Sequence, residues 1–221
     1  MDEAQELPDD LDQLRLDFLW LKYDLDQYKK IFISSNPDKK ELLIKTADAF
    51  FYHLHRYYWD RFILGISRLT DPEATRSNSN LSLSSLKKYF PKLPKGQREK
   101  AETRLSSIIE LAGKFRSRRN KTIAHRDYSS ALSKTIETEK LYLAEVEKVF
   151  QEIEGYLNTF ISAFTASTYS WEIHSLEDAS NLLFHLGESL VYEEMIDKRR
   201  DWEKDAEERE SRWMNVQNTR E

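Results

Sequence analysis

Residues 113–128 read GKFRSRRNKTIAHRDY, and the rest of the chain is organised around this stretch. It holds six basic side chains against one acid, Asp127, and the pattern Arg119-Asn120, four further residues and His125. A guanidinium binds phosphate oxygens in a planar fork, and an imidazole transfers protons near neutral pH. These are the groups that a protein needs to handle a phosphodiester without a metal ion.

The residues upstream predict a helix that leads into this stretch. Its apolar positions are three and four residues apart, as on a buried helix face: Leu105, Ile108, Ala112 and Phe115. Arg119 takes the next position on that face and Ile123 the one after it. Because arginine is rarely buried without a partner, we expect Arg119 to meet an anionic ligand, a carboxylate or a subunit interface.

Two strings carry a resemblance to a known family. Arg119-Asn120-x4-His125 resembles the signature of the HEPN superfamily, small all-helical proteins common in bacterial toxin and phage-defence systems. The longer string RNKTIAHRD at 119–127 is most similar to the AbiU-type abortive-infection branch, as is the run RLTDP at 68–72 with the LSL that follows at 81–83. The resemblance covers roughly residues 10–165 in helix order.

Composition and periodicity predict an all-α fold, an elongated antiparallel bundle of about five to seven helices. Glycine and proline are scarce, at 5 each among 221 residues, which argues against a sheet-rich or disordered chain. The expected helices cover 9–33, 37–69, 82–90, 95–117, a stretch from about 136, and a last helix opened by a capping box at 175–178. We expect a HEPN-like domain over 1–170 and a helical extension over 171–221 that packs on the domain or on a partner.

Several classes of protein are excluded by what the sequence lacks. Cysteine is absent, so there is no disulfide, thiolate metal site or cysteine nucleophile. No apolar run approaches the roughly 18 residues that span a bilayer, and the acidic start MDEAQELPDD lacks the apolar core of a signal peptide. We therefore expect a cytoplasmic protein with no membrane partner, no metal and no cofactor.

The charge distribution is uneven along the chain. Residues 87–128 contain 13 Lys and Arg against 4 Asp and Glu, whereas the remainder contains 21 against 35. A basic segment in an acidic protein suggests a local site for an anion. The alternative, that basic helices pair with acidic neighbours in the fold, is equally compatible with the composition.

The resemblance implies metal-independent cleavage of RNA by a homodimer with a composite site. His125 would serve as base or acid, Arg119 would stabilise the charged phosphorane, and Asn120 would orient His125 or the phosphate. Flanking phosphates would be held by further basic residues: Arg116, Arg118, Lys121 and Arg126. The products would end in 2′,3′-cyclic phosphates. On an ideal helix Arg119 and His125 lie about 240° apart, so they converge only if the helix ends or distorts, or if a second subunit supplies one of them.

Structural roles remain open for each of these residues. Arg119 could pair with an acid from another helix, His125 could cap a helix C-terminus, and Asp127 could pair with Arg126 or cap the next turn. A non-catalytic HEPN module that binds RNA, nucleotide or a protein partner would use the same cleft, and a helical scaffold would use the motif as an ion-pair cluster.

Tyr128 suggests a possible partner. Some HEPN toxins have a tyrosine two residues after the histidine, and a nucleotidyltransferase-type antitoxin inactivates them by modifying it. Tyr128 follows His125 by three residues, so the alternative for it is a packing or rim position.

Overall fold

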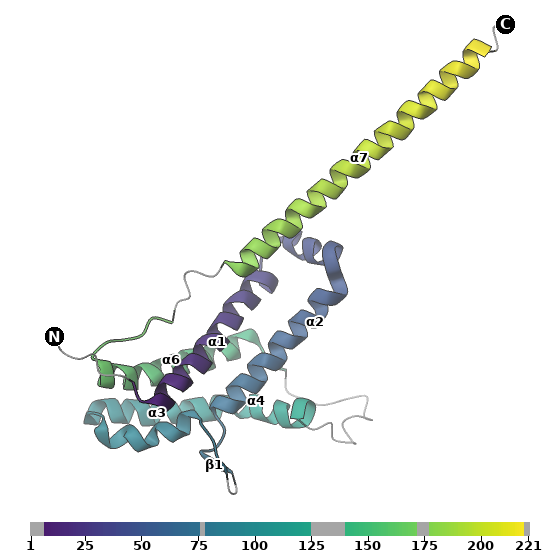
Figure 1. Cartoon of the computed structure of the whole chain (residues 1–221). Helices are drawn as coiled ribbons and strands as arrows, with labels where there is room; N and C mark the ends of the chain where they lie inside the picture. Colours follow the sequence, from purple (N-terminus) through teal and green to yellow (C-terminus); the bar gives the residue numbers. More distant parts are fainter. Residues whose placement is uncertain (1–6, 76–77, 125–139, 172–176, 219–221) are drawn as a thin grey trace. The chain divides into compact units, whose positions relative to one another are not determined.

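The structure, a computed structural model, describes residues 7–75, 78–124, 140–171 and 177–218 (Figure 1). The chain divides into two compact units. The first comprises Met1–Tyr28 and His53–Ser175, and the second comprises Lys29–Tyr52 and Leu176–Glu221. The helices α1 (Asp9–Phe32) and α2 (Pro37–Leu69) each contribute to both units.

In the first unit, α1 and α2 run antiparallel. Arg61 pairs with Asp24 at 2.8 Å and Arg68 pairs with Asp17 at 2.5 Å. The later arginine of α2 thus pairs with the earlier aspartate of α1, so the two helices run in opposite directions. Gly65 lies between these two arginines and faces Leu21 of α1. This pairing places the end of α2 beside the first half of α1.

An aromatic core holds α1, α2 and α6 (Leu143–Thr165) together. Phe18 is fully buried, and its ring meets the edges of Phe150 at 5.2 Å and Trp171 at 5.0 Å between centroids. Phe62 of α2 meets Phe150 in the same edge-on manner at 6.4 Å. Large buried rings of this kind each remove much apolar area from water, and they add to the aliphatic side chains of the core.

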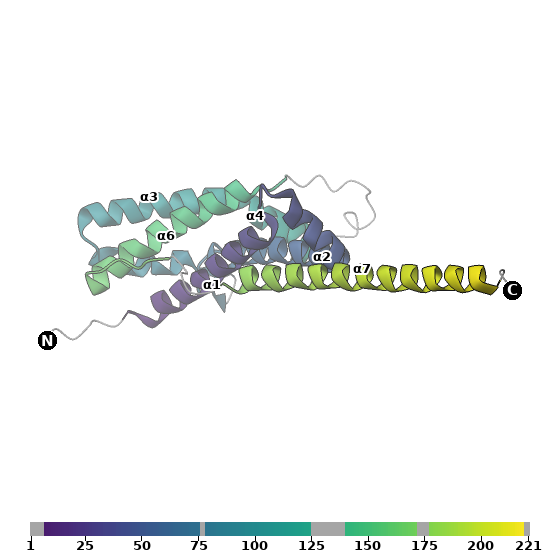
Figure 2. The same cartoon turned by 90° about the horizontal axis from the view of Figure 1, so that it is seen from above.

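The remaining helices of the first unit form an antiparallel pair. Figures 1 and 2 both show α3 (Lys95–Leu111) alongside α6. Arg104 of α3 pairs with Glu152 of α6 at 3.0 Å, and Lys114 of α4 (Gly113–Arg118), the helix that follows α3, pairs with Glu145 near the start of α6 at 2.9 Å, so the chain that runs forward through α3 and α4 runs backward along α6. A 3-10 helix, η1 (Leu83–Lys92), closes the end of the core, where Phe90 stacks on Phe160.

A short antiparallel ladder follows α2. Its strands are β1 (Ala74–Thr75) and β2 (Asn78–Ser79), two residues each, with Ala74 opposite Ser79. The two strands are therefore the sides of a hairpin.

The second unit contains the end of α1, the start of α2 and α7 (Asp178–Asn218). The side chain of Asn36 caps α2 by accepting the Asp38 N–H at 3.0 Å, and Pro37 is the first helical residue. The backbone of α2 is interrupted at Ala47 (φ −164°, ψ 69°), which the sequence did not predict. The first half of α7 exposes large apolar side chains: Leu182, Phe184, Val191, Tyr192 and Met195. Across the described residues, no helix combines the length and hydrophobicity needed to cross a membrane.

The predicted all-α class is confirmed, and one expected helix is divided into two elements. The start expected at about 136 lies outside the described residues; within them α6 begins at Leu143, since Tyr142 is extended (φ −114°, ψ 152°) and its N–H donates to the Glu145 carboxylate at 2.9 Å. The helix expected over 95–117 breaks at Ala112. The division into 1–170 and 171–221 stays a prediction.

Two glycines test how tightly the helices pack. A Cβ on Gly65 would collide with the side chain of Leu21, which is only 2 % exposed and has no room to move. We expect Gly65→Ala to lower the free energy of unfolding by about 1–2 kcal/mol, because overpacking outweighs the gain in helix propensity.

A Cβ on Gly113 would meet no described atom within 4 Å, so Gly113→Ala serves as the matched control. Urea denaturation of both variants checks this, and equal stabilities would contradict the close helix packing.

Candidate functional site

The candidate site forms where the end of α2 meets the segment that follows α3. After the break at Ala112 come α4 (Gly113–Arg118) and a π-helix, η2 (Arg119–Ala124). Ala112 keeps a near-helical backbone (φ −71°, ψ −10°), and Phe115 is fully buried. The apolar face predicted from the sequence therefore continues across the break and carries Arg119 to the edge of the core.

Arg116 joins three helix ends. Its Nη1 donates to the Thr70 carbonyl at 2.9 Å, just beyond α2, and its Nη2 donates to the Ile109 carbonyl at 3.0 Å in the last turn of α3. Carbonyls at helix ends lack intrahelical partners, and a cation there is favourable. These bonds give Arg116 a structural role beside the phosphate contact predicted for it, which stays a prediction.

Arg119 is held by a carboxylate. Its Nη1 donates to both oxygens of Asp71, at 2.8 and 2.9 Å, and its Nε donates to the side-chain oxygen of Asn120 at 3.1 Å. The two ion-pair side chains are 23 % and 25 % exposed, so the pair is half-buried rather than freely solvated. Of the three partners expected for Arg119, the structure shows the carboxylate. No described residue accepts from the Arg119 Nη2.

The π-helix begins at Arg119 itself. A π turn closes i to i+5 hydrogen bonds and so contains more residues than an α turn, and such turns occur frequently at functional sites. The angle calculated for an ideal α-helix therefore does not apply beyond Arg119. A distortion of the helix after Arg119 was one of the two conditions under which Arg119 and His125 were expected to converge; the other, a second subunit, stays a prediction.

The remaining predicted site residues divide between two groups. Asn120 and Lys121 are exposed, and Arg118 is half-buried. Four others lie outside the described residues, so their positions and roles stay predictions: His125, Arg126, Asp127 and Tyr128.

Lys114 shows that part of the basic stretch is paired internally. It donates to Glu145 at 2.9 Å, and this bond, together with the backbone N–H of Tyr142, holds the pKa of the Glu145 carboxyl below its ordinary value. Lys114, Arg116 and Arg119 thus have partners from within the fold. The alternative that the basic helices pair with acidic neighbours accounts for part of the charge of this stretch.

The sequence around Asp71 explains why its carboxylate lies at the end of α2, where it contacts Arg119. Pro72 disfavours a helical backbone at the residue before it, which ends α2 near Leu69. Asn80 then closes the hairpin, because its N–H donates to the Glu73 carbonyl at 2.7 Å and its side chain donates to the Pro72 carbonyl at 2.8 Å. The hairpin returns the chain to Asp71.

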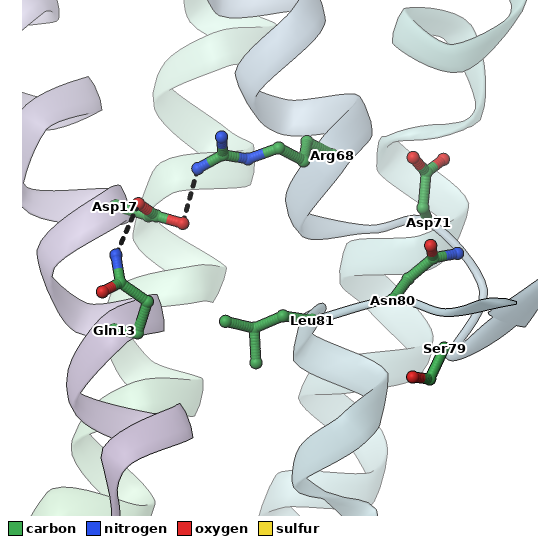
Figure 3. A pocket seen from close by; sticks show the side chains of 7 residues that line it. All are labelled: Gln13, Asp17, Arg68, Asp71, Ser79, Asn80 and Leu81. Carbon is green, nitrogen blue, oxygen red and sulfur yellow. Dashed lines mark hydrogen bonds and ion pairs between the residues drawn. The ribbon is translucent and has the colours of Figure 1, made fainter.

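A polar pocket of about 420 Å³ opens beside Asp71 (Figure 3). We call it the Asp71 pocket. It is lined from α1, α2 and the hairpin by seven residues: Gln13, Asp17, Arg68, Asp71, Ser79, Asn80 and Leu81. On one side Asp17 accepts from Gln13 at 3.1 Å and from Arg68 at 2.5 Å, and Leu81 points across the pocket towards α1.

Asp71 is the residue of the site that the sequence did not assign. It was present in the run RLTDP, which carries part of the family resemblance, but nothing in periodicity connects that run to Arg119, 48 residues later. The sequence feature that could have indicated the contact is the joint presence of two short strings. One has an acid just after a helix, and the other has an arginine on an apolar helix face.

A double-mutant cycle measures the bond between Asp71 and Arg119. We expect Asp71→Ala, Arg119→Ala and the double variant to give a coupling free energy of about 1 kcal/mol, since the pair is half-buried and charge-assisted. The Arg98–Glu102 pair, exposed along one helix at 2.9 Å, is the matched control and should give a smaller value. Urea denaturation supplies the free energies, and a coupling no larger than that of the control would show that the bond contributes nothing specific.

Comparison with known families identifies the chain. The model of the HEPN family described as AbiU2 matches residues 4–183, well over half of the 221 residues. No curated protein and no solved structure matches it. The match includes both strings that meet at the Asp71–Arg119 bond, RLTDP and RNKTIAHRD. The predicted resemblance is thereby confirmed: the chain belongs to the AbiU2 family and is a HEPN module of the abortive-infection type.

Proposed function

We propose that this protein is a metal-independent endoribonuclease of a phage-defence or toxin–antitoxin system. The observation that carries the proposal is the placement of Arg119. A half-buried carboxylate fixes its guanidinium at the start of a π-helix, directly before the stretch that ends in His125. A donor held in this way before substrate arrives loses little conformational entropy on binding a phosphate.

The chemistry assigns one step to each side chain. His125 takes the proton of a ribose 2′-hydroxyl, whose oxygen then attacks the neighbouring phosphorus. Arg119 stabilises the additional negative charge on the phosphorane, using the Nη2 group that the described fold leaves for a ligand. The bond between phosphorus and the 5′-oxygen breaks, that oxygen takes a proton from a protonated His125 imidazole, and the products are a 2′,3′-cyclic phosphate and a 5′-hydroxyl. Asn120 positions the Arg119 guanidinium through their 3.1 Å hydrogen bond.

A homodimer completes the proposed site. HEPN proteins often dimerise, and a twofold axis brings two copies of one motif together. In such a dimer one subunit could supply the acid and the other the base for one phosphodiester. The proposed protein partner is a nucleotidyltransferase-type antitoxin that acts on Tyr128.

A second candidate function rests on the same ion pair. Because Asp71 neutralises much of the charge of Arg119, the protein could instead be a non-catalytic module that binds RNA, nucleotide or a protein partner in this cleft. Cleavage separates the two functions.

Purified protein incubated with RNA in excess EDTA provides the first test. We expect cleavage with 2′,3′-cyclic phosphate ends and none of DNA of the same sequence, which lacks the attacking hydroxyl. His125→Ala should reduce the rate by 10²–10⁴-fold, the range typical for loss of a general acid or base. His185→Ala, which alters an exposed histidine of α7, is the control and should leave the rate unchanged. Cleavage that survives His125→Ala would exclude the proposed chemistry, and binding without cleavage would favour the module.

The dependence of RNA affinity on salt provides the second test. Lys121 and Arg118 are proposed to contact flanking phosphates. We expect Lys121→Ala and Arg118→Ala each to lower the slope of log affinity against log salt by about 0.7, the value for one contact to a single strand. Arg199→Ala, at a strongly exposed position in α7, should leave the slope unchanged. An equal change in all three variants would point to general attraction rather than a site.

A further inference from the structure

The Asp71 pocket has a charge balance that separates it from the basic stretch. Its lining contains two carboxylates, Asp17 and Asp71, and one guanidinium, Arg68. Arg68 pairs with Asp17 and Arg119 pairs with Asp71, so the formal charges at the pocket cancel. A phosphate would meet two carboxylates here and is disfavoured, whereas a neutral polar group is not.

The Asp71 pocket contains both hydrogen-bond donors and hydrogen-bond acceptors. The Asp17 and Asp71 carboxylates accept, while Arg68 has Nε and Nη1 donors that no described residue uses. The side-chain amide of Gln13 carries a donor and an acceptor at the rim. Leu81, 41 % exposed, offers an apolar surface among these polar groups. A flat ligand with donors and acceptors along its edge and an apolar face suits this set.

Asp71 connects the pocket to Arg119. Its carboxylate oxygens lie 2.8 and 2.9 Å from the Arg119 Nη1, and the same residue lines the pocket. A nucleotide whose phosphate binds Arg119 therefore has its own or its neighbour's base within reach of the pocket. The volume of about 420 Å³ lies within the range of small-ligand sites.

We propose that the Asp71 pocket binds an unpaired purine base of the RNA, with guanine the best match. The inference rests on the proposed function for the phosphate at Arg119, and it adds a base-recognition site to it. Guanine presents the acceptors N7 and O6 to a guanidinium such as Arg68 and amine donors to carboxylates such as Asp17. Adenine has an N7 acceptor and an amine, uracil has no amine, and cytosine has no N7. Single-stranded RNA exposes these edges to a protein.

The test compares RNA probes that differ at one position. A short fluorescent oligouridylate with one central guanosine is compared with probes that carry adenosine, uridine or an abasic nucleotide there. Binding is measured by anisotropy at fixed salt with the His125→Ala protein, so that the RNA stays intact. We expect the abasic probe to bind about tenfold more weakly than the guanosine probe, in line with loss of one recognised base.

Substitutions in the pocket should abolish this dependence on the base. We expect Arg68→Gln and Gln13→Ala to reduce the ratio of abasic to guanosine dissociation constants to below about twofold. Arg61→Gln is the matched control, since Arg61 forms the neighbouring α1–α2 ion pair with Asp24 and does not line the Asp71 pocket. It removes the same charge and should leave the ratio unchanged. Thermal melting confirms that each variant is folded.

The outcomes separate this inference from the nuclease proposal. Three results would overturn the purine pocket even if RNA is cleaved. They are a ratio of abasic to guanosine dissociation constants near one in the His125→Ala protein without a pocket substitution, a ratio that Arg68→Gln leaves unchanged, and a preference for uridine. A purine preference that Arg68→Gln removes would support the pocket even if no cleavage occurs. Failure to bind any of the probes would overturn both.

Discussion

The bond between Asp71 and Arg119 is the interaction on which the geometry of the candidate site depends. It joins the end of α2 to the start of the π-helix, two points 48 residues apart in the chain. A guanidinium at the edge of an apolar face is costly unless a charged partner satisfies it. Asp71 meets that need, and the hairpin closed by Asn80 keeps the carboxylate at the place where α2 ends. Without this bond Arg119 would have no fixed direction, and the Asp71 pocket would lose one wall.

The helices expected over 9–33 and 37–69 show what periodicity can predict, and the helix expected over 95–117 shows its limit. The expected bounds match those of α1 and α2 to within a residue, although the interruption of α2 at Ala47 was not predicted. In the helix expected over 95–117, apolar residues continue at helical spacing on both sides of Ala112, and Gly113 is a local feature that weakens a helix without showing that it breaks. The structure provides a stabilising contact at this point, since Arg116 satisfies carbonyls from two other helix ends. A contact that spans 46 residues cannot be read from a local pattern.

The same reasoning applies to the site. The sequence required a partner for Arg119 and named a carboxylate among three possibilities, but the chain has 39 acids and periodicity does not rank them. The Asp71 pocket was beyond prediction because three separate segments line it, and apart from Leu81 each lining residue by itself is an ordinary polar side chain. What the sequence did provide was the pair of strings that carry the family resemblance, and each of them contains one member of the Asp71–Arg119 ion pair. A short motif of this kind can therefore reflect a tertiary contact, although the partner in that contact cannot be identified from the motif alone.

The pairing of Arg119 also has a consequence for how an anion would be attracted. A guanidinium that already faces a carboxylate has little net charge to offer at a distance, although its directed N–H donors remain effective at contact. Long-range attraction must therefore come from basic side chains without such a partner, and Lys121 is exposed on the first turn of the π-helix. Under the proposed function the two kinds of basic side chain have different roles. Peripheral charges attract the RNA at a distance, and Arg119 provides a donor of fixed geometry where the phosphorane forms. If the Asp71 pocket binds a base as proposed, it would not compete for the phosphate, because its two carboxylates are already paired with Arg68 and Arg119.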